Sequence, residues 1–557
     1  MGSGAPALPA LKLAVIADHS VAQRFALDSL DSIEGCTEYA LFSCTNSRPG
    51  KRRLKHAAYY ALNLVTVRNH LTRLVPLAQG RKRIARTVTF EAEQEGAWQR
   101  LPKAVVRELA GFDIVLKLGM GLLRVPPEEE MPAPILSFHH GDPDRYRGRP
   151  AGFWEIANGE PVVGQIVQAI GNSLDAGHVA AFAETKVHPW SYKATLVEAY
   201  RHSPLIINEA IRNALARRWI AKPCTGRNWR LPGNATVLAF VLKTAARAVR
   251  RLAYGAVMEK KWQVSLAPVA PADVPATVEG HSFPPPAAWE TLKVGCDYLF
   301  YADPFFSTDP PGILLEALRR GSGLGEIVLA GPQGHRRISS LAGHASYPAT
   351  VSLRGRQLIV PEIASVSAPR LFAIQEGVMR ELGPLAMESE ERVSDPTLIE
   401  HEGRLYLFGN IPRHGSSALF LWLAEGIKGP FRLHPQSPVR ISPRGGRMAG
   451  NLLRDGDRLI RFGQNLEGGY GDGILAFEVE ELSPERYCEK PLGVIRFTDR
   501  HGPHTLNFDG GRIVFDWYVE RFAPLAGVRR LLARLRARRL ARGASEARPA
   551  PDPGPRG

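Results

Sequence analysis

Residues 135–179 read ILSFHHGDPDRYRGRPAGFWEIANGEPVVGQIVQAIGNSLDAGHV, and polar side chains are unusually dense in this segment. It begins with a short apolar run, which predicts a buried strand, and His139 and His140 follow at the end of that run. An acidic turn, Leu174-Asp175-Ala176-Gly177, comes later in the segment. Because open α/β sheets carry their chemistry at strand ends, a histidine and a carboxylate in these places predict a pair that handles protons.

Further apolar runs on the N-terminal side predict the sheet to which this strand belongs. Residues 11–17 and 112–119 both have the pattern of buried strands, and 135–138 is the third. Helical stretches separate them, so we expect a doubly wound α/β domain over residues 1–204. Residues 205–257 are then expected to form a helical connector.

Four short motifs in this half resemble the folate-dependent formyltransferases, a family that includes methionyl-tRNA and sugar N-formyltransferases. They occur in the family's order: Ser137-Phe138-His139, Tyr146-Arg147-Gly148, Asn158-Gly159-Glu160 and Leu174-Asp175-Ala176-Gly177. The resemblance implies 10-formyltetrahydrofolate as the cofactor. Ser137 stands where the family has a catalytic asparagine, and a serine hydroxyl donates one hydrogen bond over a shorter reach.

The resemblance also implies roles for individual residues. His139 would bind the developing oxyanion or move protons, Asp175 would set the charge of that histidine and accept a proton, and Ser137 would replace the amide. Tyr146, Arg147 and Arg149 are expected to bind substrate, because guanidinium groups fit phosphate and carboxylate. The alternative is that Tyr146, Arg147 and Gly148 only shape a loop.

The C-terminal half has a different pattern, in which strands dominate after a proline-rich stretch at 267–287. Similar units, each a glycine turn followed by a strand, recur at 353–359, 401–407, 454–460 and 508–514. With the region around Asp303, these repeats predict a five-bladed β-propeller over residues 258–525.

Two aspartate-proline pairs suggest where the propeller carries its chemistry. Asp303-Pro304 and Asp395-Pro396 resemble the inner-strand motif of five-bladed glycosidases of the arabinofuranosidase/xylosidase group, glycosyl hydrolase family 43. That resemblance implies carboxylates at the channel mouth, with Glu362 as a proton donor. The order Asp303, Glu362, Asp395 differs from these families, which place two aspartates before the glutamate.

Later segments resemble the N-terminal domain of plant glucosamine inositolphosphorylceramide transferases. The motifs are Arg447-Met448-Ala449-Gly450-Asn451, residues 461–465, Tyr470-Gly471 and His504-Thr505-Leu506-Asn507. This resemblance adds Arg447 and His504 to the candidate site and implies the handling of a glycan or glycolipid.

Composition limits the class of protein and its partners. The chain has 557 residues, 44% of them hydrophobic and 23% charged, which is typical of a globular protein with several domains. A net charge of +16 predicts an acidic partner. Residues 526–557 are expected to form a basic helix and a disordered tail, and the helix could bind an anionic membrane or be solvated. A nucleic-acid partner is not expected, since a propeller replaces the small barrel of the tRNA enzyme.

The five cysteines lack the spacing of metal ligands, so no metal site is expected and the thiols should be reduced. The N-terminus lacks the features of a secretion signal, and no apolar run is long enough to span a bilayer. We therefore expect a cytoplasmic protein, peripheral to the inner face of the membrane if its basic tail binds lipid.

These observations lead to one principal hypothesis and two alternatives. The first is an enzyme of surface-polysaccharide or glycoconjugate biosynthesis that transfers a formyl group from 10-formyltetrahydrofolate to an amino sugar or nucleotide sugar, while the propeller binds the glycan. The second is a propeller that acts as a glycosyltransferase or glycoside hydrolase beside a formyltransferase domain without folate chemistry. The third is a non-catalytic scaffold that binds glycans.

Overall fold

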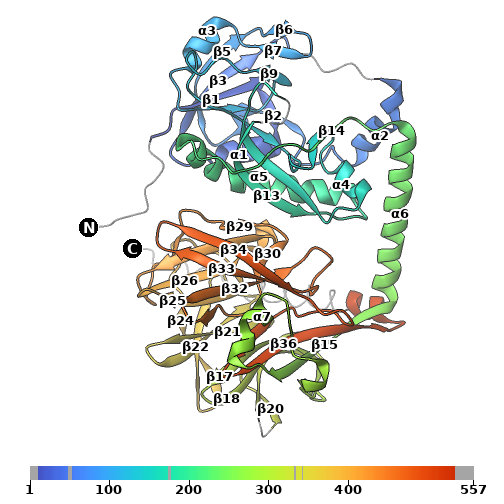
Figure 1. Cartoon of the computed structure of the whole chain (residues 1–557), viewed down its shortest axis with the longest axis vertical. Coiled ribbons are helices and arrows are strands. Elements are labelled where there is room, and N and C mark those ends of the chain that lie inside the picture. The colour runs from blue at the N-terminus through green and yellow to red at the C-terminus, as the bar shows by residue number, and fades with distance from the viewer. Residues whose placement is uncertain (1–9, 48–52, 174–176, 332–333, 342, 533–557) are drawn as a thin grey trace, which may run out of the picture.

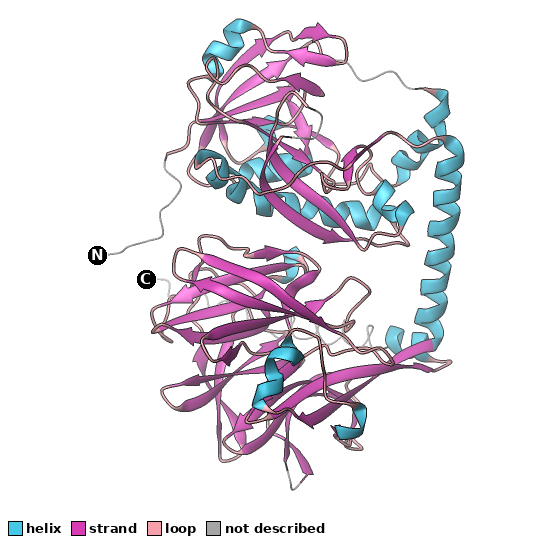
Figure 2. Cartoon of the chain, in the orientation of Figure 1, coloured by secondary structure: helices cyan, strands magenta, loops and turns pink. Residues whose placement is uncertain are grey.

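The computed structural model describes residues 10–47, 53–173, 177–331, 334–341 and 343–532. An α/β part and a part made mostly of strands lie one above the other, and helix α6 (Asn234–Val257) runs along one side and joins them (Figure 1). Figure 2 shows that most helices belong to the N-terminal part. Among the helices of the described ranges, none combines the length and apolarity needed to cross a bilayer.

Within the described residues, the N-terminal part contains a nine-stranded sheet whose centre is parallel. Strand β1 pairs in parallel with β3 and β8, and β8 pairs in parallel with β10. Strands β12 and β13 extend the sheet in antiparallel fashion beyond β10. The bounds are β1 Leu13–Asp18, β2 Val21–Gln23, β3 Glu38–Cys44, β4 Leu74–Pro76, β5 Arg83–Phe90, β8 Ile114–Lys117, β10 Ile135–His139, β12 Val162–Ala169 and β13 His178–Lys186.

Helices cover both faces of this sheet, as expected for a doubly wound arrangement. Successive residues of a strand point to opposite faces, so Leu13 and Val15 pack with α1 and α5, whereas Ala14 and Ile16 pack with α3. Both sets are fully or almost fully buried. The helices are α1 Arg24–Asp31, α2 Ala57–Val65, α3 Lys103–Leu109, α4 Phe153–Asn158 and α5 Tyr192–Leu215.

The α/β part extends further along the chain than residue 204. The expected boundary falls inside α5, which continues to Leu215. Beyond it, β14 (Arg227–Trp229) returns to pair with β11 (Tyr146–Gly148). The connector between the two parts is therefore α6 itself. The three short strands β6 (Glu93–Glu95), β7 (Trp98–Arg100) and β9 (Leu122–Arg124) form a small sheet of their own.

In the described residues, the C-terminal part forms five separate antiparallel sheets of four or five strands. The first joins the beginning and end of this part, since β15 (Met258–Pro268) pairs with β36 (Arg512–Phe522), flanked by β16 (Glu290–Thr291) and β35 (Leu506–Asp509). The other four each use consecutive strands. Their bounds are β17 Tyr298–Thr308, β18 Pro311–Arg319, β19 Gly325–Gly331, β20 Gly334–Arg337; β21 Ala345–Leu353, β22 Arg356–Ile363, β23 Arg370–Gln375, β24 Val378–Pro384; β25 Ser394–His401, β26 Arg404–Asn410, β27 Ala418–Ala424, β28 Arg432–Leu433, β29 Arg440–Ile441; and β30 Arg444–Met448, β31 Leu453–Asp455, β32 Arg458–Asn465, β33 Ile474–Leu482, β34 Tyr487–Ile495.

The glycine turns of the sequence repeats lie between neighbouring strands of a sheet, as the repeats predict. Gly355 joins β21 to β22 with φ of 73°, and Gly403 joins β25 to β26 with φ of 74°. Such left-handed positions favour glycine, which has no Cβ to clash with the backbone. Both turns join the first two strands of their sheets.

The sheets follow one another around a ring. Strand β17 contacts β21, β21 contacts β25, and β25 contacts β30. The ring closes because β35 contacts β17, while the Leu506 N–H donates to the Ala449 carbonyl just after β30. The α/β part rests on this ring through polar contacts, among them Ser442 Oγ to Glu184 Oε2 at 2.7 Å.

Candidate functional site

The α/β part has a cleft of about 710 Å³ at the carboxyl ends of β1, β8 and β10. Asp18, Lys117, Ser137 and His140 are among its lining residues. Open α/β sheets bind ligands at this edge, where the ends of parallel strands meet. Asp18 supports that reading, because its Oδ1 is buried without a hydrogen-bond partner in the described residues while its Oδ2 accepts from the Met120 N–H at 2.9 Å.

The expected catalytic residues of this cleft lie in different environments. Ser137 is half-buried and lines the cleft. His139 is also half-buried, and its Nε2 lies 3.2 Å from the carbonyl oxygen of Tyr146. Asp175 lies outside the described residues. A pairing of His139 with Asp175 therefore stays a prediction.

His140 lines the cleft as well, although the sequence analysis assigned it no role. Its ring packs against Tyr200 and Phe25 at centroid distances of 4.4 and 5.2 Å, and its Nε2 lies 3.0 Å from Ser203 Oγ. Burial, with the neighbouring His139 as a smaller cause, lowers the pKa of His140 to about 3. This imidazole is therefore neutral at physiological pH. Its position directly after the β10 strand pattern was the available sequence signal.

Of the three residues expected to bind substrate in this part, two make hydrogen bonds within the protein. The Tyr146 hydroxyl donates to Glu160 Oε1 at 2.9 Å, and Arg147 Nε donates to the Gly226 carbonyl at 2.7 Å. Both residues belong to β11; the Arg147 contact holds this strand beside the residue that precedes β14, and the Tyr146 contact joins it to the segment after α4. Arg149 is exposed and follows directly after β11. Binding of an anionic group by Arg149 stays a prediction.

In the C-terminal part, the same backbone feature, a β-bulge at a residue before proline, recurs at the candidate site. Asp303, Tyr347 and Asp395 each lie in the first strand of their sheet, directly before a proline, with left-handed φ of 48°, 46° and 49°. The register with the second strand shifts at each of these places. A bulge of this kind re-aims the side chain. Tyr347 shows the result, since its hydroxyl reaches Thr397 Oγ1 at 3.0 Å in the next sheet.

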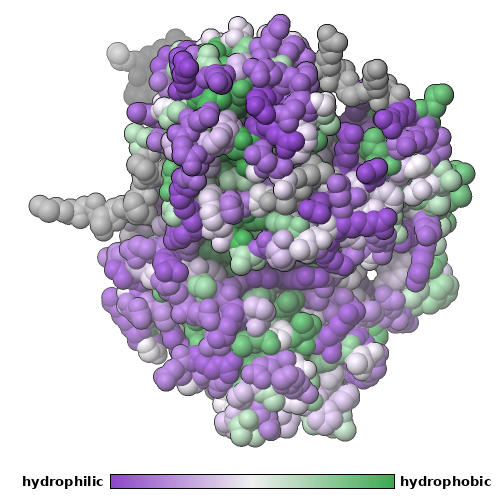
Figure 3. All heavy atoms as spheres, turned by 45° about the horizontal axis from the view of Figure 1, so that its top comes forward, coloured by the Kyte–Doolittle hydropathy of each residue, from purple (hydrophilic) through white to green (hydrophobic). Residues whose placement is uncertain are grey.

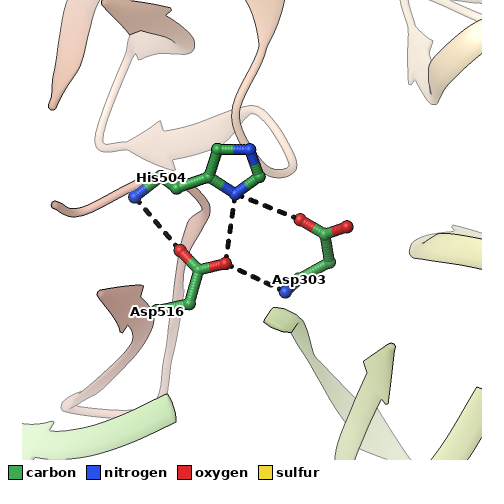
Figure 4. A group of neighbouring side chains, drawn as sticks. All are labelled: Asp303, His504 and Asp516. Atoms are coloured by element: carbon green, nitrogen blue, oxygen red, sulfur yellow. Dashed lines mark hydrogen bonds and ion pairs between the residues drawn. The ribbon is translucent and has the colours of Figure 1, made fainter. Parts of the chain in front are cut away.

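Asp303, His504 and Asp516 form a buried cluster between neighbouring sheets (Figure 4). His504 Nδ1 lies 3.1 Å from Asp516 Oδ2 and 3.4 Å from Asp303 Oδ1. Asp516 is completely buried and also accepts from the backbone N–H groups of Asp303, His504 and Thr505 at 3.0, 3.1 and 2.7 Å. The Thr505 hydroxyl donates to Asp303 Oδ1 at 2.7 Å. Sequence reasoning found Asp303 and His504 but missed Asp516, which lies within the apolar strand IVFDWYV.

The charges in this cluster compensate one another. Burial favours the neutral imidazole, but the negative charge of Asp516 and hydrogen bonds to both aspartates raise the pKa of His504 to about 10. Burial opposes ionisation of Asp303 as well, yet the hydrogen bond and charge of His504 hold its pKa below the ordinary value. His504 is thus an imidazolium between two carboxylates at physiological pH. Its Nε2 is buried and has no hydrogen-bond partner in the described residues.

A second carboxyl group, Glu316, lies against Asp303. Strand β18 places it opposite Ala302, next to Asp303 in strand β17. Burial, followed by the negative charge of Asp303, raises the pKa of Glu316 well above its ordinary value. Two neighbouring carboxyl groups do not both ionise readily, which favours the protonated form of Glu316. Sequence reasoning missed Glu316, although a single glutamate inside the apolar run ILLEAL was a usable signal.

Asp395 is held by the half-buried Arg447. Arg447 donates from Nη2 to Asp395 Oδ1 at 3.0 Å and also contacts Oδ2 through Nε. Gln464 Nε2 donates to the same carboxylate at 3.2 Å. Burial raises the pKa of Asp395 to about 6, despite the opposing charge of Arg447. This two-point contact fixes the orientation of both side chains.

Glu362 contacts this group from the neighbouring sheet. It accepts hydrogen bonds from the Asp395 N–H and the Ser394 hydroxyl, both at 3.1 Å, and Arg392 lies 3.3 Å away. These contacts hold the bulge that presents Asp395. The structure thus brings Glu362, Asp395 and Arg447 together, with Asp303 and His504 in the adjacent cluster. A proton-donor role for Glu362 stays a prediction.

Aromatic side chains stand beside the charged cluster. The ring of Tyr470 lies 4.5 Å from that of His504, and the Trp262 ring lies 5.1 Å away. Tyr470 is 43% exposed, so its ring forms part of the surface over the buried imidazolium. It also lies 5.6 Å from the Arg447 guanidinium carbon. Aromatic faces of this kind stack on sugar rings and attract cations.

The same cluster has the composition of a metal site. In the described residues, the ligand-type atoms of Asp303, His504 and Asp516 all lie within 4.8 Å of one another. However, the only imidazole nitrogen between the carboxylates is Nδ1, and its distances to them are those of hydrogen bonds. The donor set fits a proton bridge better than a metal ion.

The family of glucosamine inositolphosphorylceramide transferase 1, N-terminal, matches residues 340–511 of this chain. Two rice proteins named glucosamine inositolphosphorylceramide transferase 1 are similar to it, from the japonica and indica subspecies, at 27% and 26% identity over 159 residues. These matches cover 28% of this chain and only 21% of each relative. They confirm the resemblance expected from Arg447 and His504, which both lie inside the matched range.

Solved structures resemble each part only loosely. An N-formyltransferase from Helicobacter canadensis, described in complex with folinic acid and dTDP-3-aminofucose, is 13% identical, with a TM-score of 0.26 over 43% of this chain and 80% of its own. A family 117 glycoside hydrolase from Zobellia galactanivorans is 12% identical, with a TM-score of 0.25 over 39% and 83%. Likenesses of this size carry no information on activity.

Proposed function

We propose that this protein is an enzyme of glycoconjugate metabolism whose C-terminal part is a five-bladed β-propeller that binds and processes a carbohydrate at its centre. The observation that carries the proposal is the buried cluster of Asp303, His504 and Asp516, beside which strand β18 places the carboxyl group of Glu316. Pairs of carboxyl groups in which one is protonated are what the chemistry of glycosidic bonds uses.

The ring of sheets supports this location. Propeller blades surround a central channel, toward which their first strands lie. The first strands β17, β21, β25 and β30 each have a register shift, and residues at or beside these shifts form the candidate site. Tyr470 supplies a partly exposed aromatic face at the same position. The match of residues 340–511 to a family named for a glucosamine transferase supports a sugar as the ligand.

Each residue of the cluster would have a different role. Glu316 would give its proton to an oxygen of the sugar, and the positive charge of His504 would stabilise the negative charge that remains on the two carboxyl groups. Arg447 holds Asp395 in a fixed orientation, so that this carboxylate can accept hydrogen bonds from sugar hydroxyl groups on its free side. This chemistry serves glycosyl transfer and glycoside hydrolysis alike.

The test measures binding and turnover of sugars by the whole chain. Titration calorimetry with a panel of mono- and disaccharides that includes hexosamines, together with release of nitrophenol from nitrophenyl glycosides, should detect a ligand or a reaction. The variants Asp303→Asn and Glu316→Gln should abolish the response, while exposed Asp509→Asn should not. A response that survives both central substitutions would refute the proposal.

A second function, formyl transfer from 10-formyltetrahydrofolate to an amino sugar, has its own observation. Ser137 lines the cleft at the carboxyl ends of β1, β8 and β10, in the place where the resemblance puts the family's asparagine. Calorimetry with a stable analogue of 10-formyltetrahydrofolate tests it, repeated on His139→Ala and Asp175→Asn. Micromolar binding that the wild type shows and both variants lose would support it, and no binding by the wild type would exclude it. Loss of carbohydrate binding in the Asp303 variant would leave this result unchanged, so the two functions can be separated.

A further inference from the structure

Helix α6 exposes an apolar stripe over most of its length. Leu238, Leu242, Val249 and Leu252 are 60%, 63%, 66% and 74% exposed. Their spacing places them on one face of a helix with 3.6 residues per turn, whereas Val237 and Phe240 on another face are buried against the α/β part. At 1.5 Å per residue the stripe is about 21 Å long.

The stripe continues onto the C-terminal segment. The Ala523 N–H donates to the Val257 carbonyl at 2.7 Å, and Arg530 Nη1 donates to the Gly255 carbonyl at 2.9 Å, so this segment packs against the last turn of α6. The exposed apolar residues of the segment are Phe522, Leu525, Val528, Leu531 and Leu532, between 48% and 64% exposed. Figure 3 shows apolar residues along the right-hand edge of the molecule, on the side of α6 in Figure 1. The stripe and these five residues together are the α6 face.

The two segments that form the α6 face, helix α6 and the C-terminal segment, carry only basic charges. Residues 234–257 contain Lys243, Arg247, Arg250 and Arg251 and no acidic residue. Residues 521–532 contain Arg521, Arg529 and Arg530 and again no acidic residue. The nearest carboxylates from neighbouring strands are already engaged, Glu259 by Arg529 at 2.6 Å and Glu520 by the Tyr254 hydroxyl at 2.7 Å.

We propose that the α6 face binds the surface of an anionic lipid bilayer, with the apolar stripe in the interfacial region and the flanking basic residues against lipid phosphates. A helix that lies in the membrane interface binds through the burial of its apolar residues and through the attraction of its lysines and arginines to anionic lipids. A second copy of this chain fits the face less well. A symmetric helix pair would bring Lys243 and Arg250 near their own copies, and α6 has no acidic residue to compensate them.

The arrangement has a consequence for the substrate. Helix α6 spans both parts of the molecule, so its binding would lay the α/β part and the ring of sheets side by side along the same membrane. A lipid-linked acceptor could then reach either part without leaving the bilayer surface. This consequence does not depend on which of the two reactions the protein catalyses.

The test is sedimentation of the full chain with sonicated vesicles of phosphatidylcholine containing about 30% phosphatidylserine, compared with vesicles of pure phosphatidylcholine. We expect binding to the anionic vesicles only, and a decrease when salt is raised, because the charges are exposed. The double variants Leu242→Asp/Leu252→Asp and Lys243→Glu/Arg250→Glu should each reduce the partition coefficient at least about tenfold. Leu433→Asp, which changes a leucine 46% exposed in β28, is the matched control and should bind as the wild type does.

Three results would overturn the proposal. The first is equal binding by the wild type and both double variants. The second is a loss of binding only when the arginines of residues 534–542 are replaced, which would assign the membrane contact to the tail instead of α6. The third is a dimer in analytical ultracentrifugation that Leu242→Asp/Leu252→Asp converts to a monomer, which would make the α6 face an interface between copies.

Discussion

The Nδ1 atom of His504 lies 3.4 Å from Oδ1 of Asp303, although the two residues come from opposite ends of the strand-rich part of the chain. The contact exists because the first sheet takes its strands from both ends of that part, so β35 lies beside β17. This contact joins the first and second sheets of the ring, and it also helps to set the charge of the candidate site. A change that opens the ring should therefore disturb the site, and a change in the charges should weaken the ring.

Replacement of Asp516 by asparagine should destabilise the protein strongly. The carboxylate is completely buried, accepts three backbone hydrogen bonds and neutralises His504. Removing one partner of a buried ion pair leaves the other charge uncompensated, and we expect a loss of about 3 kcal/mol in the free energy of unfolding. Urea denaturation monitored by tryptophan fluorescence measures it, with exposed Asp509→Asn as the control. An equal midpoint for both variants would contradict the ion pair.

Stability should fall on the alkaline side because of His504. Its pKa is raised in the folded state to about 10, so its contribution is fully present below the ordinary histidine value of about 6.5 and is lost as the pH rises through about 10. The raised pKa of Glu316 acts in the same direction. Unfolding midpoints measured from pH 6 to pH 10 should decline in the wild type, and the decline should be shallower in His504→Gln. The matched variant His281→Gln, at an exposed position, should keep the slope of the wild type; the same slope in His504→Gln would show that His504 is not held as an imidazolium.

Replacement of Tyr347 by phenylalanine should cost about 2 kcal/mol of stability. The hydroxyl accepts from the Gly450 N–H at 2.8 Å and lies 3.0 Å from Thr397 Oγ1, so it ties three sheets together. Its loss leaves a buried N–H without a partner, which is more costly than the loss of an exposed hydrogen bond. Denaturant unfolding measures the effect. Tyr298→Phe is a suitable control, since the residue is similarly buried and its hydroxyl makes no hydrogen bond among the described residues. Equal losses of stability in the two variants would show that the Tyr347 hydroxyl does not join the three sheets.

The substitution Ser137→Asn should strengthen formyl transfer if the cleft of the α/β part carries it. An amide donates over a longer reach than a hydroxyl and so restores the group expected from the resemblance. The rate of formyl transfer, or of hydrolysis of 10-formyltetrahydrofolate, should rise about tenfold, and Ser137→Ala should lower it, because one positioned donor to an oxyanion is worth at least that factor. No change in either variant would place the reaction elsewhere.

Much of the architecture could be predicted because its signals are local. The apolar runs at 11–17, 112–119 and 135–138 became β1, β8 and β10, since a fully buried parallel strand needs apolar side chains on both faces. The glycine turns at Gly355 and Gly403 became hairpins because left-handed backbone favours glycine. The boundary expected after residue 204 fell inside α5, where Pro204 lies within the helix and does not end it.

The candidate site could be predicted only in part. Asp303 and Asp395 had a sequence signal because each precedes a proline, and the structure shows both at bulges. Asp516 and Glu316 had only weak signals, as single charged residues in apolar strands. Their importance depends on which residues face them across the ring, and spacing along the chain does not contain that information.

The sequence by itself determined the elements: where strands run, where they turn, and which polar residues stand at their ends. These features depend on the backbone preferences and burial of a few neighbouring residues. The tertiary structure alone decided that the pKa values of His504 and Glu316 are raised and that one face of α6 is left exposed by the described residues. The physical reason is that a pKa and an exposed surface depend on groups brought together from distant parts of the chain, and only packing sets those distances.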